Sequence, residues 1–199
     1  MKPDHRRRQL RLAGRLALTT ALGTLVLGYG RRAYAGSCSP DGSIILCSGP
    51  ADPATDRAQS LYGNYGSLVS VQTAPGFGLD TSRNSNYPGG INIDSSGGLS
   101  FDGSAAGLSI RAGATALRGY NFGGGKVVLD TRGGALTAGD FSNPYSMQSG
   151  IRASNGFGGN GITIRTGDIT ATELGILARN AGAGDVVIDT TAGRIFARG

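Results

Sequence analysis

Two twelve-residue stretches of this chain align without a gap: residues 127–138 read VVLDTRGGALTA, and residues 186–197 read VVIDTTAGRIFA. Shorter versions of the same phrase occur at 162–171 (ITIRTGDITA) and at 91–101 (INIDSSGGLSF). A phrase that recurs within one chain is typical of repeat architectures, in which each copy buries its apolar side chains against its neighbours. These repeats therefore decide the expected fold.

Each copy alternates apolar and polar residues over a few positions, a period of two that indicates half-buried strands. Stretches rich in Gly and Asn follow, such as 155–161 (NGFGGNG) and 180–184 (NAGAG). We expect turns there, because both residue types tolerate positive φ. Three short strands with three turns fit into about 20–30 residues, one coil of a parallel β-helix. The sequence thus predicts an all-β fold, a right-handed parallel β-helix with an irregular, disulfide-containing N-terminal segment.

In such a helix the coils stack about 4.8 Å apart, and equivalent apolar residues form continuous inward ladders. The residues that we expect to point inward are Val127, Leu129, Leu136, Ile162, Ile164, Ile169, Val186, Ile188 and Ile195. A Gly-rich β-sandwich or a disordered low-complexity chain is the alternative, since 36 of the 199 residues are Gly. Ungapped similarity over twelve positions favours the solenoid.

The four copies begin at residues 91, 127, 162 and 186, so the intervals are 36, 35 and 24 positions. Only the last interval fits one short coil. We expect the longer ones to contain a degenerate coil, for which 107–111 (GLSIR) is the candidate, or a loop. The loop candidate is 141–149 (FSNPYSMQS), because Pro144 is incompatible with a central strand.

Residues 1–35 have the three parts of a secretory signal peptide. Basic residues are concentrated in 2–15, an apolar run covers 16–30, and the small residues Ala33 and Ala35 suit the −3 and −1 positions of a cleavage site. We predict cleavage between Ala35 and Gly36 after export through Sec. An uncleaved membrane anchor is the alternative, but the apolar run is shorter than the ~20 residues of a comfortable span.

The leader also accounts for the net charge. The chain carries +6, from 19 Lys and Arg against 13 Asp and Glu, which by itself would suggest a partner such as nucleic acid. Eight of the basic residues and one acidic residue lie in the leader, which leaves 11 basic and 12 acidic residues and a mature charge of −1. We therefore expect no nucleic-acid binding.

The only two cysteines, Cys38 and Cys47, follow the predicted cleavage site closely. In an exported protein such a pair is expected to form a disulfide, since the periplasm is oxidising. We place both in an irregular lead-in over 36–88, with one short helical turn at 54–61, and assign 89–199 to the β-helical repeats.

No catalytic, cofactor or metal site is predicted. The single histidine, His5, lies in the leader, so the mature chain lacks the base of a Ser-His-Asp or Cys-His site. Asp130 and Asp189 occupy equivalent positions, with Asp94 in a third copy and Arg165 in the fourth. Paired carboxylates are the equipment of glycoside hydrolysis, but capping of turn amides at strand ends accounts for the same pattern. We prefer the capping role.

Two glycine-rich phrases lack the pattern of a cofactor or metal site. Residues 158–163 (GGNGIT) carry Thr where a calcium-binding repeat requires Asp, and 123–126 (GGGK) lacks the spacing of a phosphate-binding loop. Five tyrosines expected in loops remain as candidate contact residues. They are Tyr62, Tyr65, Tyr87, Tyr120 and Tyr145.

Four features together resemble a known class of protein. They are the leader, the early pair Cys38 and Cys47 with the phrase 43–49 (SIILCSG) around the second cysteine, and the phrases at 167–171 (GDITA) and 175–186 (GILARNAGAGDV). They are similar to the N-terminal part of the passenger of a Gram-negative autotransporter (type V secretion), over residues 36–199. The resemblance implies passage through the periplasm and then display on the outer membrane or release. It also implies a non-enzymatic role in presentation or adhesion.

The partners that the resemblance implies are an outer-membrane translocator barrel and a ligand on a host surface or in the extracellular matrix. This sequence departs from the family in showing no C-terminal translocator, so we expect a fragment or a truncated product. Two-partner secretion passengers fit less well, because only 143–145 (NPY) approaches their N-P-N-x phrase. An exported β-helical enzyme acting on polysaccharides is the rival function.

Overall fold

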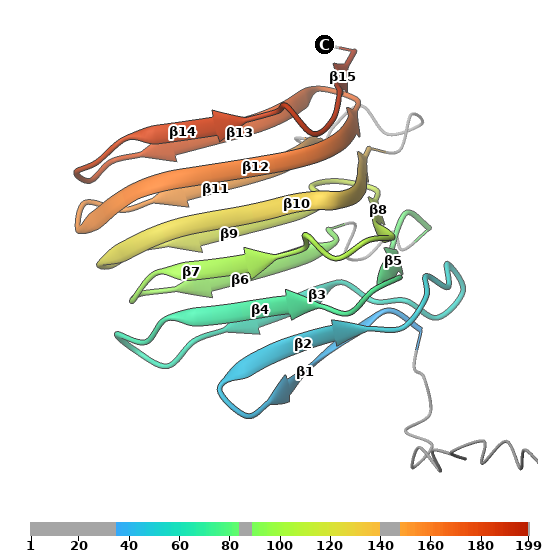
Figure 1. Cartoon of the computed structure of the whole chain (residues 1–199), viewed down its shortest axis with the longest axis horizontal. Helices are drawn as coiled ribbons and strands as arrows, with labels where there is room; N and C mark the ends of the chain where they lie inside the picture. Colours follow the sequence, from blue (N-terminus) through green and yellow to red (C-terminus); the bar gives the residue numbers. More distant parts are fainter. Residues whose placement is uncertain (1–34, 84–88, 140–147, 199) are drawn as a thin grey trace, which may run out of the picture. The chain divides into compact units, whose positions relative to one another are not determined.

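The computed structural model describes residues 35–83, 89–139 and 148–198, which form fifteen strands arranged in stacked coils (Figure 1). The described residues contain no helix, and so none that is long and apolar enough to cross a membrane. The predicted all-β parallel β-helix is confirmed. The predicted leader lies outside the described residues, except for Ala35.

Each coil runs through three faces in a fixed order. The first face is a five-stranded parallel sheet, so the described chain makes five coils. Its strands, in stacking order, are β3 (Gln59–Tyr62), β6 (Ile91–Ser95), β9 (Leu117–Asn121), β11 (Ser149–Asn155) and β13 (Leu174–Asn180).

The second and third faces belong to one ten-stranded sheet, because two long strands run through both. These are β10 (Gly125–Ala138) and β12 (Gly159–Ala171), which bend between Thr131 and Ala135 of β10, where the register shifts. The second face also contains β2 (Ile44–Ser48), β4 (Val69–Thr73), β7 (Leu99–Asp102) and β14 (Val186–Asp189). The third face also contains β5 (Gly78–Asp80), β8 (Leu108–Ala112) and β15 (Ile195–Ala197).

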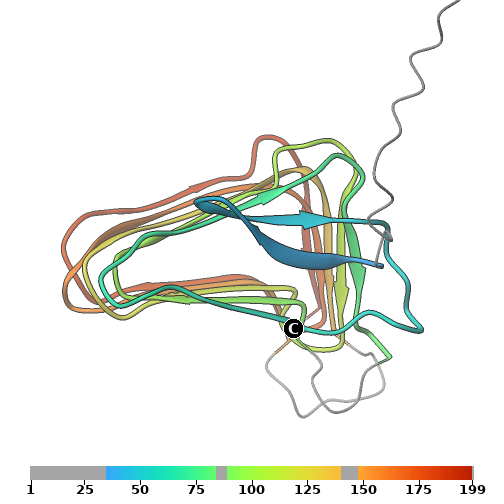
Figure 2. The same cartoon turned by 90° about the horizontal axis from the view of Figure 1, so that it is seen from below.

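The first and second faces meet at a narrow turn, and the third face closes the wide end of the coil (Figure 2). Alternating side chains from all three faces fill the interior as one apolar core. Six of the predicted inward residues are at most 1% exposed: Val127, Leu129, Leu136, Ile162, Ile164 and Ile169.

The other three predicted inward residues, Val186, Ile188 and Ile195, are 40–45% exposed. They do occupy the inward ladders, since their register partners are Ile162, Ile164 and Ile169. The prediction of their burial is wrong because they lie in the last described coil, where a neighbouring coil covers them from one side only.

The predicted equivalence of residues 91–101 with the second-face repeats is wrong for their first strand. Strand β7, not β6, pairs with the start of β10, so Val127 lies beside Leu99 and Asp130 beside Asp102. Asp94 belongs to the first face and is not the equivalent of Asp130. Strands of all three faces share the alternating pattern, which is why the phrase alone does not specify the face. The 107–111 candidate supplies the third-face strand of the same coil, β8, and is not a separate coil.

The solenoid also begins earlier than predicted. Strands β3, β4 and β5, which lie in the supposed lead-in, form a complete coil that pairs with the next one. Residues 53–55 form a turn and a strand starts at Gln59, so the helical turn expected at 54–61 is absent. Most of the loop predicted at 141–149 lies outside the described residues; Ser149 already belongs to β11.

The N-terminal end of the described stack is closed by an antiparallel hairpin of β1 (Ser37–Asp41) and β2. The predicted disulfide between Cys38 and Cys47 is confirmed, with an S–S distance of 2.05 Å, and it joins directly opposed residues of the hairpin. Cys47 is fully buried and Cys38 packs against the core. Seen from below, the hairpin lies across the end of the stack (Figure 2).

Asparagine has a different role in the turns from the one expected. Among the described residues only glycines have positive φ, including Gly98 at 100°, just before β7, and Gly161 at 105°, near the start of β12. Asn121, Asn155 and Asn180 instead end successive first-face strands at equivalent register, which we call the asparagine row. Their side chains bond to the turn backbone.

The asparagine row satisfies buried polar groups between coils. Asn121 and Asn155 are at most 1% exposed, and Asn121 Nδ2 donates to Asn155 Oδ1 at 2.7 Å. Asn121 Oδ1 accepts the Gly98 amide of the preceding coil at 3.2 Å, and Asn155 Nδ2 donates to the Gly161 carbonyl at 3.0 Å. Such bonds matter because an unpaired buried polar group is costly.

We expect the Asn155→Ala variant to lose about 1–3 kcal/mol of unfolding free energy, because the Gly161 carbonyl loses its side-chain donor and Asn121 loses an acceptor. Asn160→Ala is the matched control, since Asn160 is exposed in the same coil. Urea unfolding followed by circular dichroism measures both. Equal midpoints for the two variants would contradict this role of the row.

We expect the double variant Cys38→Ser/Cys47→Ser to lose about 2–3 kcal/mol, since the closed loop is short. The loss should be local, because coils of a solenoid contact only their neighbours. Hydrogen exchange should therefore quicken in β1 and β2 and remain slow in β10 and β12. Equal acceleration in β10 and β12 would show that the hairpin supports the whole stack.

Candidate functional site

The outer side of the first face carries two neighbouring columns of side chains. Because successive residues of a strand point to opposite sides, Arg152 and Ser154 point outward while Ile151 and Ala153 are buried. In-register pairing places the outward residues above one another. One column contains Arg118, Arg152 and Leu177. The other contains Tyr120, Ser154 and Arg179.

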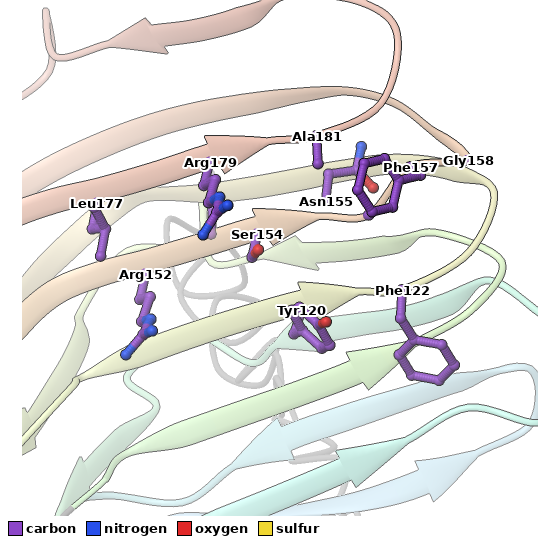
Figure 3. A pocket seen from close by; sticks show the side chains of 12 residues that line it. Tyr120, Phe122, Arg152, Ser154, Asn155, Phe157, Gly158, Leu177, Arg179 and Ala181 are labelled. Atoms are coloured by element: carbon purple, nitrogen blue, oxygen red, sulfur yellow. The ribbon is translucent and has the colours of Figure 1, made fainter.

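A groove of about 700 Å³ runs across three coils of this face, formed by β9, β11, β13 and the turns that follow them. Figure 3 shows two arginines, Arg152 and Arg179, on one side and the rings of Phe122 and Phe157 on the other, with Ser154 between them. The remaining lining residues are Tyr120, Ala153, Asn155, Gly156, Gly158, Leu177 and Ala181. We call this surface the aromatic–arginine groove.

The aromatic side of the groove is strongly exposed. Phe157, in the turn after β11, is 92% exposed, and Phe122, in the equivalent turn after β9, is 54% exposed. The Phe122 ring lies 6.0 Å from the Tyr120 ring, centroid to centroid, in a tilted arrangement. Exposed aromatic rings clustered in a groove are typical of contact surfaces.

The basic side of the groove carries two guanidinium groups with no ion pair inside the described chain. The described residues form two ion pairs, Arg118 with Asp94 at 3.6 Å and Arg132 with Asp130. Arg118 also stacks on Tyr120, with its Cζ 5.6 Å from the ring centroid. Arg118 is therefore engaged with Asp94 and Tyr120, whereas Arg152 and Arg179 line the groove and have no ion pair in the described chain.

The aspartates singled out from the repeats lie elsewhere, where the second face meets the third. Asp189 Oδ1 accepts the Thr191 amide at 3.0 Å, and Asp130 Oδ1 accepts the Arg132 amide at 3.2 Å. Asp102 makes the same turn with Ser104 at 3.1 Å. These contacts confirm the predicted capping role for Asp130 and Asp189, and Asp102, not Asp94, makes the equivalent contact in a third coil.

The pKa values of these carboxylates are unlike those of a general acid. Burial tends to raise the pKa of Asp130, but hydrogen bonds from the Arg132 side chain and amide outweigh it, and the pKa is lowered. The Thr191 amide and hydroxyl lower the pKa of Asp189. A general acid needs a raised pKa at neutral pH, so both groups here are ionised, bound acceptors.

The other predicted site residues are distributed as follows. Gly36 is buried, and its N–H donates to the Pro50 carbonyl at 2.9 Å, while Ala33 lies outside the described residues. Tyr120 lines the groove, and Tyr62 and Tyr65 are exposed. Tyr87 and Tyr145 fall outside the described residues. No group of three or more His, Cys, Asp or Glu side chains in the described ranges could hold a metal ion.

The sequence did not identify Arg152, Arg179, Phe122 or Phe157. The signal was present as an arginine in both first-face phrases, 150–153 (GIRA) and 175–179 (GILAR), each followed by a Gly-rich turn. The two phrases do not predict a column of arginines, because the two arginines occupy different register positions. Arg152 pairs with Leu177, and Arg179 pairs with Ser154.

Comparisons with protein families, with curated protein sequences and with solved structures found no match.

We expect Asp130 to contribute stability that is lost in acid. Its lowered folded-state pKa means that the ionised form stabilises the fold above about pH 4, and that this contribution disappears as the pH falls through the folded pKa. Asp130→Asn should therefore destabilise the fold at pH 7 by about 1–2 kcal/mol, seen as a lower melting temperature. The difference from the parent should vanish as the pH falls below the folded-state pKa of Asp130. Asp185→Asn is the control, because the exposed Asp185 carboxylate makes no hydrogen bond or ion pair in the described chain. A pH-independent difference between D130N and the parent would contradict the assignment.

Proposed function

We propose that this chain is a secreted or surface-displayed β-helical segment of an autotransporter passenger, non-enzymatic, which presents a binding face for adhesion. The observation that carries the proposal is the aromatic–arginine groove, which crosses three coils of a continuous sheet and leaves two arginines and two phenylalanines accessible. The resemblance of the leader and repeats to such passengers supplies the cellular setting.

The solenoid suits this role because its inner and outer side chains have separate tasks. Inward residues form the core, whereas Arg152 and Ser154 on the outer side of the first face are half-exposed. A stack of coils can therefore present binding side chains on its surface while the inward ladders hold the fold together. The disulfide in the first hairpin is consistent with an oxidising compartment.

The proposed route begins with Sec export and removal of residues 1–35 in the periplasm. Passage across the outer membrane then needs a translocator barrel, which a longer gene would supply in cis. The proposed ligand lies on a host surface or in the extracellular matrix.

We expect the whole chain, expressed in a Gram-negative host, to appear in the periplasm as a species that begins at Gly36 and contains an oxidised Cys38–Cys47 pair. Intact-mass analysis of the fractions before and after alkylation measures both. Replacing Ala33 and Ala35 by Arg should block processing, because the peptidase requires small residues at −3 and −1. A parent chain retained in the cytoplasm at full mass would contradict the proposed export.

The processed species should also bind saturably to cultured cells or to immobilised extracellular matrix. Fluorescence of the labelled protein, compared with labelled albumin, measures this binding. Binding no greater than that of albumin on every surface would contradict the adhesive role.

A further inference from the structure

We propose that the aromatic–arginine groove binds an acidic polysaccharide, an extended chain of sugars with carboxylate or sulfate groups, lying along the stacking direction of the coils. The inference rests on the proposed function, since it names the ligand of the same face.

The charge of the ligand follows from the two arginines. Arg152 and Arg179 line the groove and make no ion pair within the described chain, while the mature sequence as a whole carries −1. A planar guanidinium group binds carboxylate and sulfate oxygens through paired hydrogen bonds. A local pair of free guanidinium groups on a slightly acidic protein indicates an anionic ligand at this place.

The sugar component follows from the rings. Phe122 and Phe157 expose apolar surface on the opposite side of the groove, beside Tyr120 (Figure 3). The electron-rich face of an aromatic ring attracts the partly positive C–H groups on the face of a sugar. The Ser154 hydroxyl lies between the two sides and offers a donor and an acceptor to sugar hydroxyls.

The direction of the ligand follows from the register. Arg152 and Arg179 lie on neighbouring strands and two positions apart along them, because Arg179 pairs with Ser154. Their Cα atoms are therefore about 8 Å apart, given steps of about 4.8 Å between strands and about 6.6 Å for two residues. An extended chain that crosses the strands would meet one guanidinium group per coil.

A polysaccharide fits this groove better than a nucleic acid. Each DNA strand carries a phosphate every 3.4 Å or so, and binding strength depends on how many of them are neutralised. Two arginines about 8 Å apart, on a mature chain with 12 acidic and 11 basic residues, neutralise few phosphates and give no long-range attraction. A polyanion with one charge per sugar or fewer matches the groove more closely.

The test measures binding of polygalacturonate and of a sulfated glycosaminoglycan, with dextran and single-stranded poly-dT as comparison probes. Arg152→Gln/Arg179→Gln should weaken binding of both acidic polysaccharides by about tenfold or more, since two charge-assisted contacts are lost. Phe122→Ala/Phe157→Ala should weaken it by about fivefold or more through lost ring contacts. Arg111→Gln/Arg194→Gln, which removes the same charge from exposed positions outside the groove, should change it by less than about twofold.

Circular dichroism of each variant establishes that the β-solenoid is retained. All variants are compared in the same processing state, because the leader itself carries eight basic residues. The inference is overturned if neither acidic polysaccharide binds, or if poly-dT or dextran binds as tightly as the acidic polysaccharides do. It is also overturned if Arg111→Gln/Arg194→Gln weakens binding as much as Arg152→Gln/Arg179→Gln does. A failure of leader processing would overturn the proposed export alone, since the comparison between variants does not depend on it.

Discussion

The structure depends on parallel pairing of each strand with its equivalent in the next coil. This pairing places like residues above one another, so that Val127, Leu129 and Leu136 continue into Ile162, Ile164 and Ile169. A slip of one residue would turn these side chains outward and expose the whole ladder. Register is therefore the constraint from which the core, the turns and the outer columns all follow.

Buried polar rows add specificity to that register. The hydrogen bond between Asn121 and Asn155 forms only when the register places these two residues side by side. The buried Thr131 hydroxyl likewise donates to the Thr166 hydroxyl, at 3.2 Å, only in this register. Apolar ladders tolerate sliding better than hydrogen bonds do, because dispersion has little directionality. These rows distinguish one stacking of similar coils from another.

The alternation in β10 and β12 was enough to predict the fold and most of the inward residues, because burial and period two are local properties. Assignment of a strand to a face was beyond the sequence, as the misalignment of 91–101 shows, because all faces share the same alternation.

The role of Asn155 was missed because an Asn in a turn has two physical uses, backbone conformation and side-chain bonding. The sequence did not predict the groove because its residues come from three coils, and only the register shows that Phe122 and Phe157 line the same groove.

The closed hairpin at the N-terminal end gives the described stack a polarity. At that end the chain folds back antiparallel and the Cys38–Cys47 bond covers the core, whereas at the other end β14 and β15 present parallel strand edges with half-exposed apolar side chains. Both edges carry unpaired backbone groups, but the β14 and β15 edge also continues the inward apolar ladders. A strand added at that end would bury apolar side chains as well as pair its backbone, so association of strands with the described stack is favoured there.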